Sequence, residues 1–146
     1  MLNMLYLRDK YMNTATEIIL VGSNPSEASP DNSAFHPSTK SRKFIDRIFA
    51  GTGYHIAYMN LIDRKVDNNK AISKSEIKQN LDQIKEKFEL RLSSKIIALG
   101  KTASDGLRLA GIEHFALPHP SGLCRFWNDP AAAEVKIREM FIWIGT

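Results

Sequence analysis

Four short polar segments with reactive side chains each follow an apolar run of the chain. They are Ser23-Asn24-Pro25, Asn60-Leu61-Ile62-Asp63, Gly100-Lys101-Thr102 and His119-Pro120-Ser121. A histidine and two carboxamides can donate and accept hydrogen bonds to a substrate. His119 stands between Pro118 and Pro120, which stiffen the backbone there. Leu123 comes directly after the Ser121-Gly122 turn. A function must therefore explain why a rigid histidine stands beside an apolar loop tip.

Three common kinds of site do not fit these residues. Gly100-Lys101-Thr102 ends like a phosphate-binding loop, but Lys95 stands where that loop needs its first glycine. The histidines at 36, 55, 114 and 119 are not at metal-ligand spacing with a third partner, so we expect no metal. Cys124 is the one cysteine, which excludes an internal disulfide and a cysteine-ligated iron–sulfur cluster within one chain.

Length and composition indicate one ordinary domain. The chain has 146 residues, 43% of them hydrophobic, and we expect a single domain over 1–146. It has no apolar run of the length of a membrane span and no signal-peptide pattern, so we expect an intracellular protein of the cytoplasm, nucleoid or nucleus. The net charge of +4 and pI near 9.2 permit a nucleic-acid partner without requiring one.

The elements that must position these residues alternate between strand and helix. Apolar runs over 17–21, 54–59, 95–99 and 114–117 predict four strands. Helical patterns follow over 44–49, from Ser73 to Leu92, over 102–110, and from Asp129-Pro130 onward. This order predicts an α/β fold, a three-layer α/β/α arrangement with a central, mostly parallel four-stranded sheet. Sites in such folds collect at the carboxyl ends of the strands, where the first, second and fourth polar segments converge.

The polar segments belong to five short motifs in a fixed order. They are GSNPS from residue 22, His36-Pro37, LIDR at 61–64, LGK at 99–101 and HPSGLCR at 119–125. This series resembles the uracil-DNA glycosylase superfamily and is closest to its mismatch-specific (G:T/U) branch. Two residues depart from that branch. His119 begins the late motif, as in the classical and single-strand-selective branches, and Ser26 replaces a glycine in the early one, so the branch stays open.

The resemblance implies a monofunctional DNA glycosylase that hydrolyses an N-glycosidic bond without a cofactor. The target nucleotide must be flipped out of the duplex before the bond is accessible. The catalytic residues implied are Asn24 and His119. Asn24 would orient the attacking water through its amide oxygen, and His119 would donate to the uracil O2 as negative charge develops on the departing base.

The resemblance also implies a pocket for the flipped base, formed by Gly22, Ser23, Pro25, Ser26, Phe35 and Asn60. Phe35 would stack on the pyrimidine, and the amide of Asn60 would pair with O4 and N3–H of uracil. Ser26 stands where the classical branch has a tyrosine that excludes the thymine methyl. A smaller serine would admit a C5 substituent, so thymine and 5-hydroxymethyluracil join uracil as candidate bases.

The resemblance also implies that the protein binds DNA as a monomer, through a further group of residues. Leu123 would fill the hole that the flipped nucleotide leaves in the base stack. Arg125 would contact the opposite base or a phosphate. Phosphate contacts are expected from Ser121, Gly122 and Lys101, and from the segment Ser38, Thr39, Lys40, Arg42 and Lys43.

Two other functions remain open on the same fold. One is a non-catalytic binder of flipped or damaged bases, since Asn24 is a poor general base and Ser26 is unusual. The other is a relative that modifies thymine or uracil in DNA by transfer rather than hydrolysis. Base excision separates the glycosylase from the non-catalytic binder. A base that is retained with altered mass reveals the modifying relative.

Overall fold

The computed structural model describes residues 16–25, 30–64, 66, 72–91, 93–120 and 125–146. Four strands form one sheet: β1 (Glu17–Gly22), β2 (His55–Asn60), β3 (Lys95–Leu99) and β4 (Phe115–Leu117). Each described pairing is parallel, and the strand order is β2-β1-β3-β4. The four predicted strands are therefore confirmed, with ends that differ by no more than one residue.

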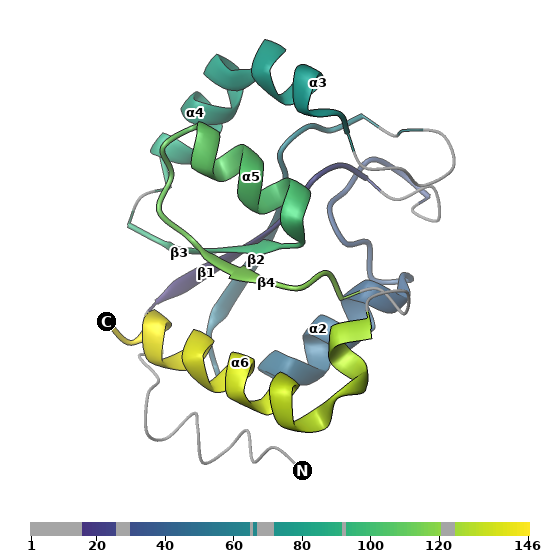
Figure 1. Ribbon diagram of the computed structural model, residues 1–146, viewed down its shortest axis with the longest axis vertical. Helices are drawn as coiled ribbons and strands as arrows, with labels where there is room; N and C mark the ends of the chain where they lie inside the picture. The colour runs from purple at the N-terminus through teal and green to yellow at the C-terminus, as the bar shows by residue number, and fades with distance from the viewer. Residues whose placement is uncertain (1–15, 26–29, 65, 67–71, 92, 121–124) are drawn as a thin grey trace.

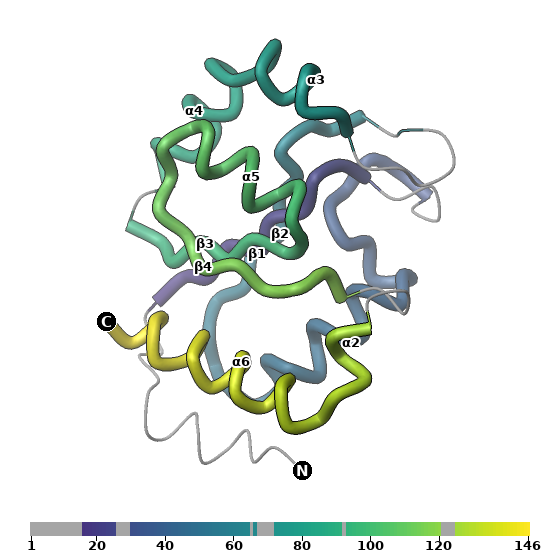
Figure 2. Tube along the Cα trace, in the orientation of Figure 1, coloured from purple at the N-terminus to yellow at the C-terminus, as the bar shows by residue number. Residues whose placement is uncertain are grey.

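Helices cover both faces of the sheet (Figure 1). One face carries α2 (Lys40–Phe49) and α6 (Pro130–Ile144). The other carries α3 (Lys74–Gln79), α4 (Leu81–Glu89) and α5 (Lys101–Leu109), and the chain trace shows the same division (Figure 2). A 3₁₀ turn, η2 (Arg125–Asn128), leads into α6. The predicted three-layer α/β/α architecture is thus confirmed.

The central strand β1 is buried on both faces. Ile18 and Leu20 belong to the core under α2 and α6, whereas Ile19 and Val21 belong to the core under α3, α4 and α5. All four side chains are 0% exposed. Successive strand residues point to opposite faces, so one apolar run supplies both cores. The carboxyl end of β1 therefore emerges from the most firmly packed part of the sheet.

The long amphipathic pattern after Ser73 predicts one helix, but the structure divides it at Asn80. Asn80 has φ −107° and ψ 15° between α3 and α4. Its Nδ2 donates to the carbonyl of Glu76 at 2.8 Å, and its backbone N–H donates to the same carbonyl at 3.1 Å. Side chains that bind nearby carbonyls compete with regular helical bonding. Ile77 and Ile84 are buried on either side of the break, so the apolar spacing does not reveal it.

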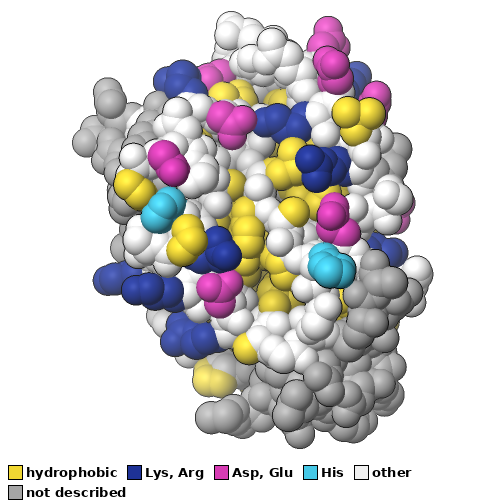
Figure 3. Space-filling model, turned by 180° about the vertical axis from the view of Figure 1, so that it is seen from behind, with side chains coloured by type: hydrophobic (Ala, Val, Ile, Leu, Met, Phe, Trp, Pro, Cys, Tyr) yellow, Lys and Arg dark blue, Asp and Glu magenta, His cyan; other side chains and the backbone are white. Residues whose placement is uncertain are grey.

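β2 forms one edge of the sheet, and most of its side chains are only partly covered. Seen from behind, the molecule shows apolar side chains among charged ones (Figure 3). The last residue of the strand, Asn60, is different: it is polar and only 3% exposed.

No helix in the described part of the chain is long and apolar enough to cross a membrane.

Candidate active site at the carboxyl edge of the sheet

Three of the predicted pocket residues meet where β1 and β2 end. Gly22 is the register partner of Asn60. A Cβ atom on Gly22 would lie 2.9 Å from Cζ of Phe35 and 3.1 Å from Oδ1 of Asn60. The two backbones stay joined beyond the strands, since Leu61 N–H donates to the Gly22 carbonyl at 2.9 Å. The absence of a side chain at Gly22 therefore lets the Phe35 ring approach the strand end beside Asn60.

Asn60 carries a buried donor that is unused. Its Nδ2 has no hydrogen-bond partner among the described residues, although the residue is almost fully buried. A buried polar atom without a partner costs about 1–3 kcal/mol, so native proteins rarely keep one without a reason. The Asn60 carbonyl, by contrast, accepts a hydrogen bond from Lys87 Nζ at 3.0 Å. The backbone at the end of β2 is thus fixed while the side-chain amide remains available to a ligand.

His119 lies two residues beyond β4 and packs against Gly100 at the end of β3. A Cβ atom on Gly100 would lie 3.2 Å from Cδ2 of His119, and Gly100 has a φ of +98° that favours glycine. Gly100 N–H donates to the Leu117 carbonyl at 2.8 Å. Trp127 Nε1 donates to the His119 carbonyl at 2.9 Å. The His119 carbonyl is therefore held by Trp127 and its side chain packs against Gly100, while its ring nitrogens have no partner in the described part of the chain.

The surroundings of His119 favour a neutral ring. The side chain keeps an exposed surface, yet protein atoms surround it, and this desolvation lowers the pKa of His119 below its ordinary value of 6.5. The exposed surface and the desolvation are compatible because one side of the ring is open and the others face protein. A neutral imidazole then offers one N–H donor and one acceptor at physiological pH.

The lowered pKa predicts how stability depends on pH. The unfolded chain takes up a proton at His119 near pH 6.5, whereas the folded chain does so only at lower pH. The contribution to the free energy of unfolding is therefore complete above pH 6.5 and is lost as the pH falls through and below that value. We expect the wild type to lose more stability than His119→Gln between pH 7.5 and 5.5 in urea unfolding. A ring-proton NMR titration midpoint at or above 6.5 would contradict this.

Asn24 is tied into the protein through the oxygen that the sequence assigns to a water molecule. Asn24 Oδ1 accepts a hydrogen bond from Ser23 Oγ at 2.6 Å and another from the Ile72 N–H at 3.3 Å. A carboxamide oxygen has two lone pairs. A water bound to this oxygen must therefore share it with, or replace, one of the present donors. The role of Asn24 in orienting water stays a prediction.

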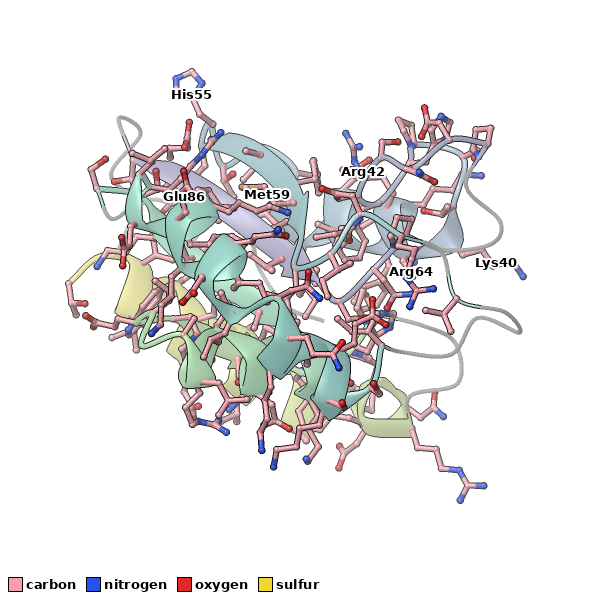
Figure 4. The ribbon with its side chains drawn as sticks, turned by 90° about the horizontal axis from the view of Figure 1, so that it is seen from above. Lys40, Arg42, His55, Met59, Arg64 and Glu86 are labelled. Carbon is pink, nitrogen blue, oxygen red and sulfur yellow. The ribbon has the colours of Figure 1, made fainter. Side chains whose placement is uncertain are left out.

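The five predicted cationic DNA contacts, at Lys40, Arg42, Lys43, Lys101 and Arg125, all lie within the described residues. Lys40 is the first residue of α2 and projects outward (Figure 4). Arg125 begins η2 and is exposed. Lys101 is 89% exposed and pairs with Asp105 at 2.9 Å, and this hydrogen bond lowers the pKa of the Asp105 carboxyl. Such exposed pairs are weak, so Lys101 can exchange Asp105 for a phosphate.

The remaining predicted residues are placed less completely. Pro25 is buried directly after Asn24. Ser26, Ser121, Gly122 and Leu123 lie outside the described residues. The base-stacking and base-reading candidates are thus brought together at β1 and β2, and His119 lies at the same edge of the sheet beside β3. Within the described residues, no group of three or more histidine, cysteine or acidic side chains is arranged to hold a metal ion.

Two residues that support the site were not predicted from the sequence. Lys87 of α4 donates to the carbonyls of Asn60 and Leu61 at 3.0 and 3.3 Å and pairs with Asp63 at 3.2 Å. Trp127 fixes the His119 carbonyl and packs edge-on against Phe44 of α2, with ring centroids 5.0 Å apart. Nothing in the local sequence pattern distinguishes these two from an ordinary helical lysine and a core tryptophan.

The sequence matches a known protein family. The family model described as the uracil DNA glycosylase superfamily matches residues 10–141. The match covers all four strands and every candidate residue named above. No curated protein sequence matches the chain.

Proposed function

Because the chain belongs to the uracil DNA glycosylase superfamily, we propose that it is a monofunctional glycosylase for uracil or a 5-substituted uracil in DNA. The superfamily consists of hydrolases of the N-glycosidic bond that act on DNA, which supports DNA as the partner. The observation that carries the proposal is the buried, unused amide nitrogen of Asn60 beside Gly22 and Phe35. A DNA-repair role places the protein inside the cell, where we propose that it works as a monomer.

The pocket at Asn60 suits a flipped uracil. The Asn60 Nδ2 would donate to O4, and its Oδ1 would accept from N3–H. The Phe35 ring supplies an apolar face for stacking, 6.1 Å from the Tyr58 ring on the neighbouring strand. With the amide in this orientation, cytosine would set its N4 amino donor against the Asn60 donor, and such mismatches are discriminated strongly. Asn60 would therefore select for uracil.

His119 would act on the departing base. When the C1′–N1 bond breaks, the base leaves with the bonding electrons, and negative charge accumulates on its O2. The neutral imidazole N–H of His119 would donate a hydrogen bond to that oxygen, which stabilises the transition state more than the bound substrate. Water then adds to C1′ and gives up a proton to the solvent, and the released base anion takes up a proton in turn. The Trp127 hydrogen bond to the His119 carbonyl and the packing of its side chain against Gly100 would keep His119 in place during the reaction.

The DNA itself would bind along the same edge. Lys40 and Arg125 offer exposed cations for phosphates, and Lys101 does so after it leaves Asp105. Leu123 is proposed as the wedge that replaces the flipped nucleotide, with Ser121 and Gly122 as backbone donors to phosphate. The C5 substituent would be accommodated at Ser26.

A non-catalytic base binder is the second candidate, and one observation favours it. The Asn24 oxygen that should orient water already accepts hydrogen bonds from Ser23 and Ile72. If neither donor gives way, the pocket would hold a flipped base without hydrolysing its bond. A DNA-modifying relative that acts by transfer is a further alternative on the same fold.

One excision assay tests the proposal. Oligonucleotides would carry uracil, thymine or 5-hydroxymethyluracil in single strands and opposite guanine or adenine, with alkaline cleavage to reveal abasic sites. Cleavage by the wild type that is lost in His119→Ala and reduced in Asn24→Ala supports the glycosylase, and the substrate profile identifies its branch. Binding without cleavage of any substrate supports the binder. A base that is retained with altered mass supports the modifying relative.

The close contact at Gly22 predicts a steric effect on the pocket. We expect Gly22→Ala to lower excision about tenfold or more, because its methyl group would lie 2.9 Å from the Phe35 ring and push it from the strand end. Adding Phe35→Leu to Gly22→Ala should relieve the clash, so the double variant should melt at a higher temperature than Gly22→Ala alone. Gly111→Ala is the control for simple destabilisation: φ there is +73° and a Cβ meets nothing within 4 Å. Equal excision by wild type and Gly22→Ala would contradict the placement of Phe35.

A further inference from the structure

Phe35 has an unusual backbone conformation. Its φ is +50°, and it is the one non-glycine residue with positive φ in the described part of the chain. A bulky side chain in this region costs about 1–3 kcal/mol and persists only where the surroundings enforce it. The ring is nevertheless placed beside Gly22 and Asn60. Some group must therefore hold this backbone in place.

Arg42 of α2 contacts the loop that holds Phe35, its own helix and β2 at once. Its Nη1 donates to the Phe35 carbonyl at 3.2 Å, and its Nε donates to Asp46 Oδ1 at 3.1 Å. The guanidinium carbon lies 4.0 Å from the centre of the Tyr58 ring. The side chain is 24% exposed. A planar guanidinium can make these three contacts together, whereas a lysine ammonium cannot.

The partners of Arg42 reinforce one another. Tyr58 Oη donates to the same Asp46 oxygen at 3.2 Å, and burial raises the pKa of Tyr58 to about 12, so the phenol keeps its proton. The Tyr58 ring in turn packs against the Phe35 ring, at 6.1 Å between centroids. One arginine thus connects α2, β2 and the loop that presents Phe35.

We infer that Arg42 is a positioning residue, which holds Phe35 in its strained conformation so that the ring can stack on the substrate base. This inference rests on the proposed role of Phe35 in the glycosylase. It differs from the phosphate contact that the sequence suggests for Arg42, because the guanidinium already has three partners within the protein. The inference makes Arg42 a determinant of base binding that acts through Phe35 and not through its charge.

Lysine and alanine variants separate the two roles. If Arg42 positions Phe35, Arg42→Lys and Arg42→Ala both raise KM for uracil-containing DNA roughly tenfold, the order expected when one base–aromatic stack is weakened. The salt dependence of DNA binding stays unchanged in both. If Arg42 contacts a phosphate, Arg42→Lys retains activity, and Arg42→Ala lowers the slope of log K against log salt by about one. That result would overturn the inference.

Arg138 provides the matched control. It sits on α6 and pairs with Glu134 four residues away at 3.1 Å, as Arg42 pairs with Asp46. We expect Arg138→Lys and Arg138→Ala to leave KM unchanged. A double variant measures the coupling between the two residues. If Arg42 acts through the Phe35 ring, Arg42→Ala should raise KM little further in a Phe35→Ala background. Additive effects of the two changes would contradict the inference.

Limited proteolysis tests the positioning of Phe35 even if no base is excised. Chymotrypsin can cut after Phe35 only when the 35–36 bond leaves its folded position, and mass spectrometry identifies that cut. We expect faster cleavage there in Arg42→Lys and Arg42→Ala than in the wild type or Arg138→Ala, with no matching increase after the buried Phe88 and Phe141. Unchanged cleavage would overturn the positioning role. Absent excision by the wild type would instead overturn the proposed function alone.

Discussion

Replacing His119 with alanine is expected to lower the rate of base excision about 10²–10³-fold, the usual loss when one donor to a developing oxyanion is removed. The ring nitrogens have no partner in the described part of the chain, and desolvation lowers the pKa of His119, so a neutral donor is available. Single-turnover excision measures the chemical step directly. The loss should appear in that step more than in DNA affinity, because the charge on O2 exists only as the bond breaks.

The same strand supplies a matched control for this result. His114 precedes β4 and His119 follows it, but His114 is fully engaged, with Ser104 Oγ and the Ile112 carbonyl each 2.8 Å from its ring nitrogens. We expect His114→Ala to lower the melting temperature and leave excision unchanged. His119→Asn should retain part of the activity, because a carboxamide can still donate a hydrogen bond. Equal excision by His119→Ala and the wild type would remove His119 from the mechanism.

The positions of the strands follow from local sequence, and so does much of the edge where the site forms. The apolar run at 17–21 is buried on both faces, which is the pattern of a central parallel strand, and it forms β1. Parallel strands place their carboxyl ends together, which brings Asn60 beside Gly22 and His119 beside Gly100. These neighbours could be predicted because strand order and direction decide them.

The hydrogen bonds that fix the site could not be predicted in this way. Asn24 binds the N–H of Ile72, which is 48 residues away in sequence, and Lys87 binds the carbonyl of Asn60 from 27 residues away. Neither contact leaves a periodic signal. Arg42 illustrates the same limit: its place after the early motif suggests a phosphate contact, whereas the folded chain turns it toward Phe35. Side-chain partners depend on tertiary packing, which periodicity does not encode.

Asn60→Ala is expected to separate function from stability. Excision of uracil should fall about 10²-fold or more, because the variant loses the groups proposed to recognise O4 and N3–H. Stability should change little or increase, because the Nδ2 of Asn60 is buried without a partner in the described structure, and such an atom costs about 1–3 kcal/mol. Removing that cost offsets the small cavity left behind. Single-turnover excision and urea unfolding of the same preparation measure both effects.

Asn80 gives the comparison that makes this prediction sharp. Its Nδ2 has a partner, the Glu76 carbonyl at 2.8 Å, so Asn80→Ala removes a satisfied hydrogen bond and should lower stability by about 1 kcal/mol. Excision should not change, because Asn80 lies between α3 and α4 and not in the pocket. Two asparagines would then respond in opposite ways to the same substitution. If Asn60→Ala loses as much stability as Asn80→Ala, the Asn60 amide serves the fold, and the pocket must recognise its base by other groups.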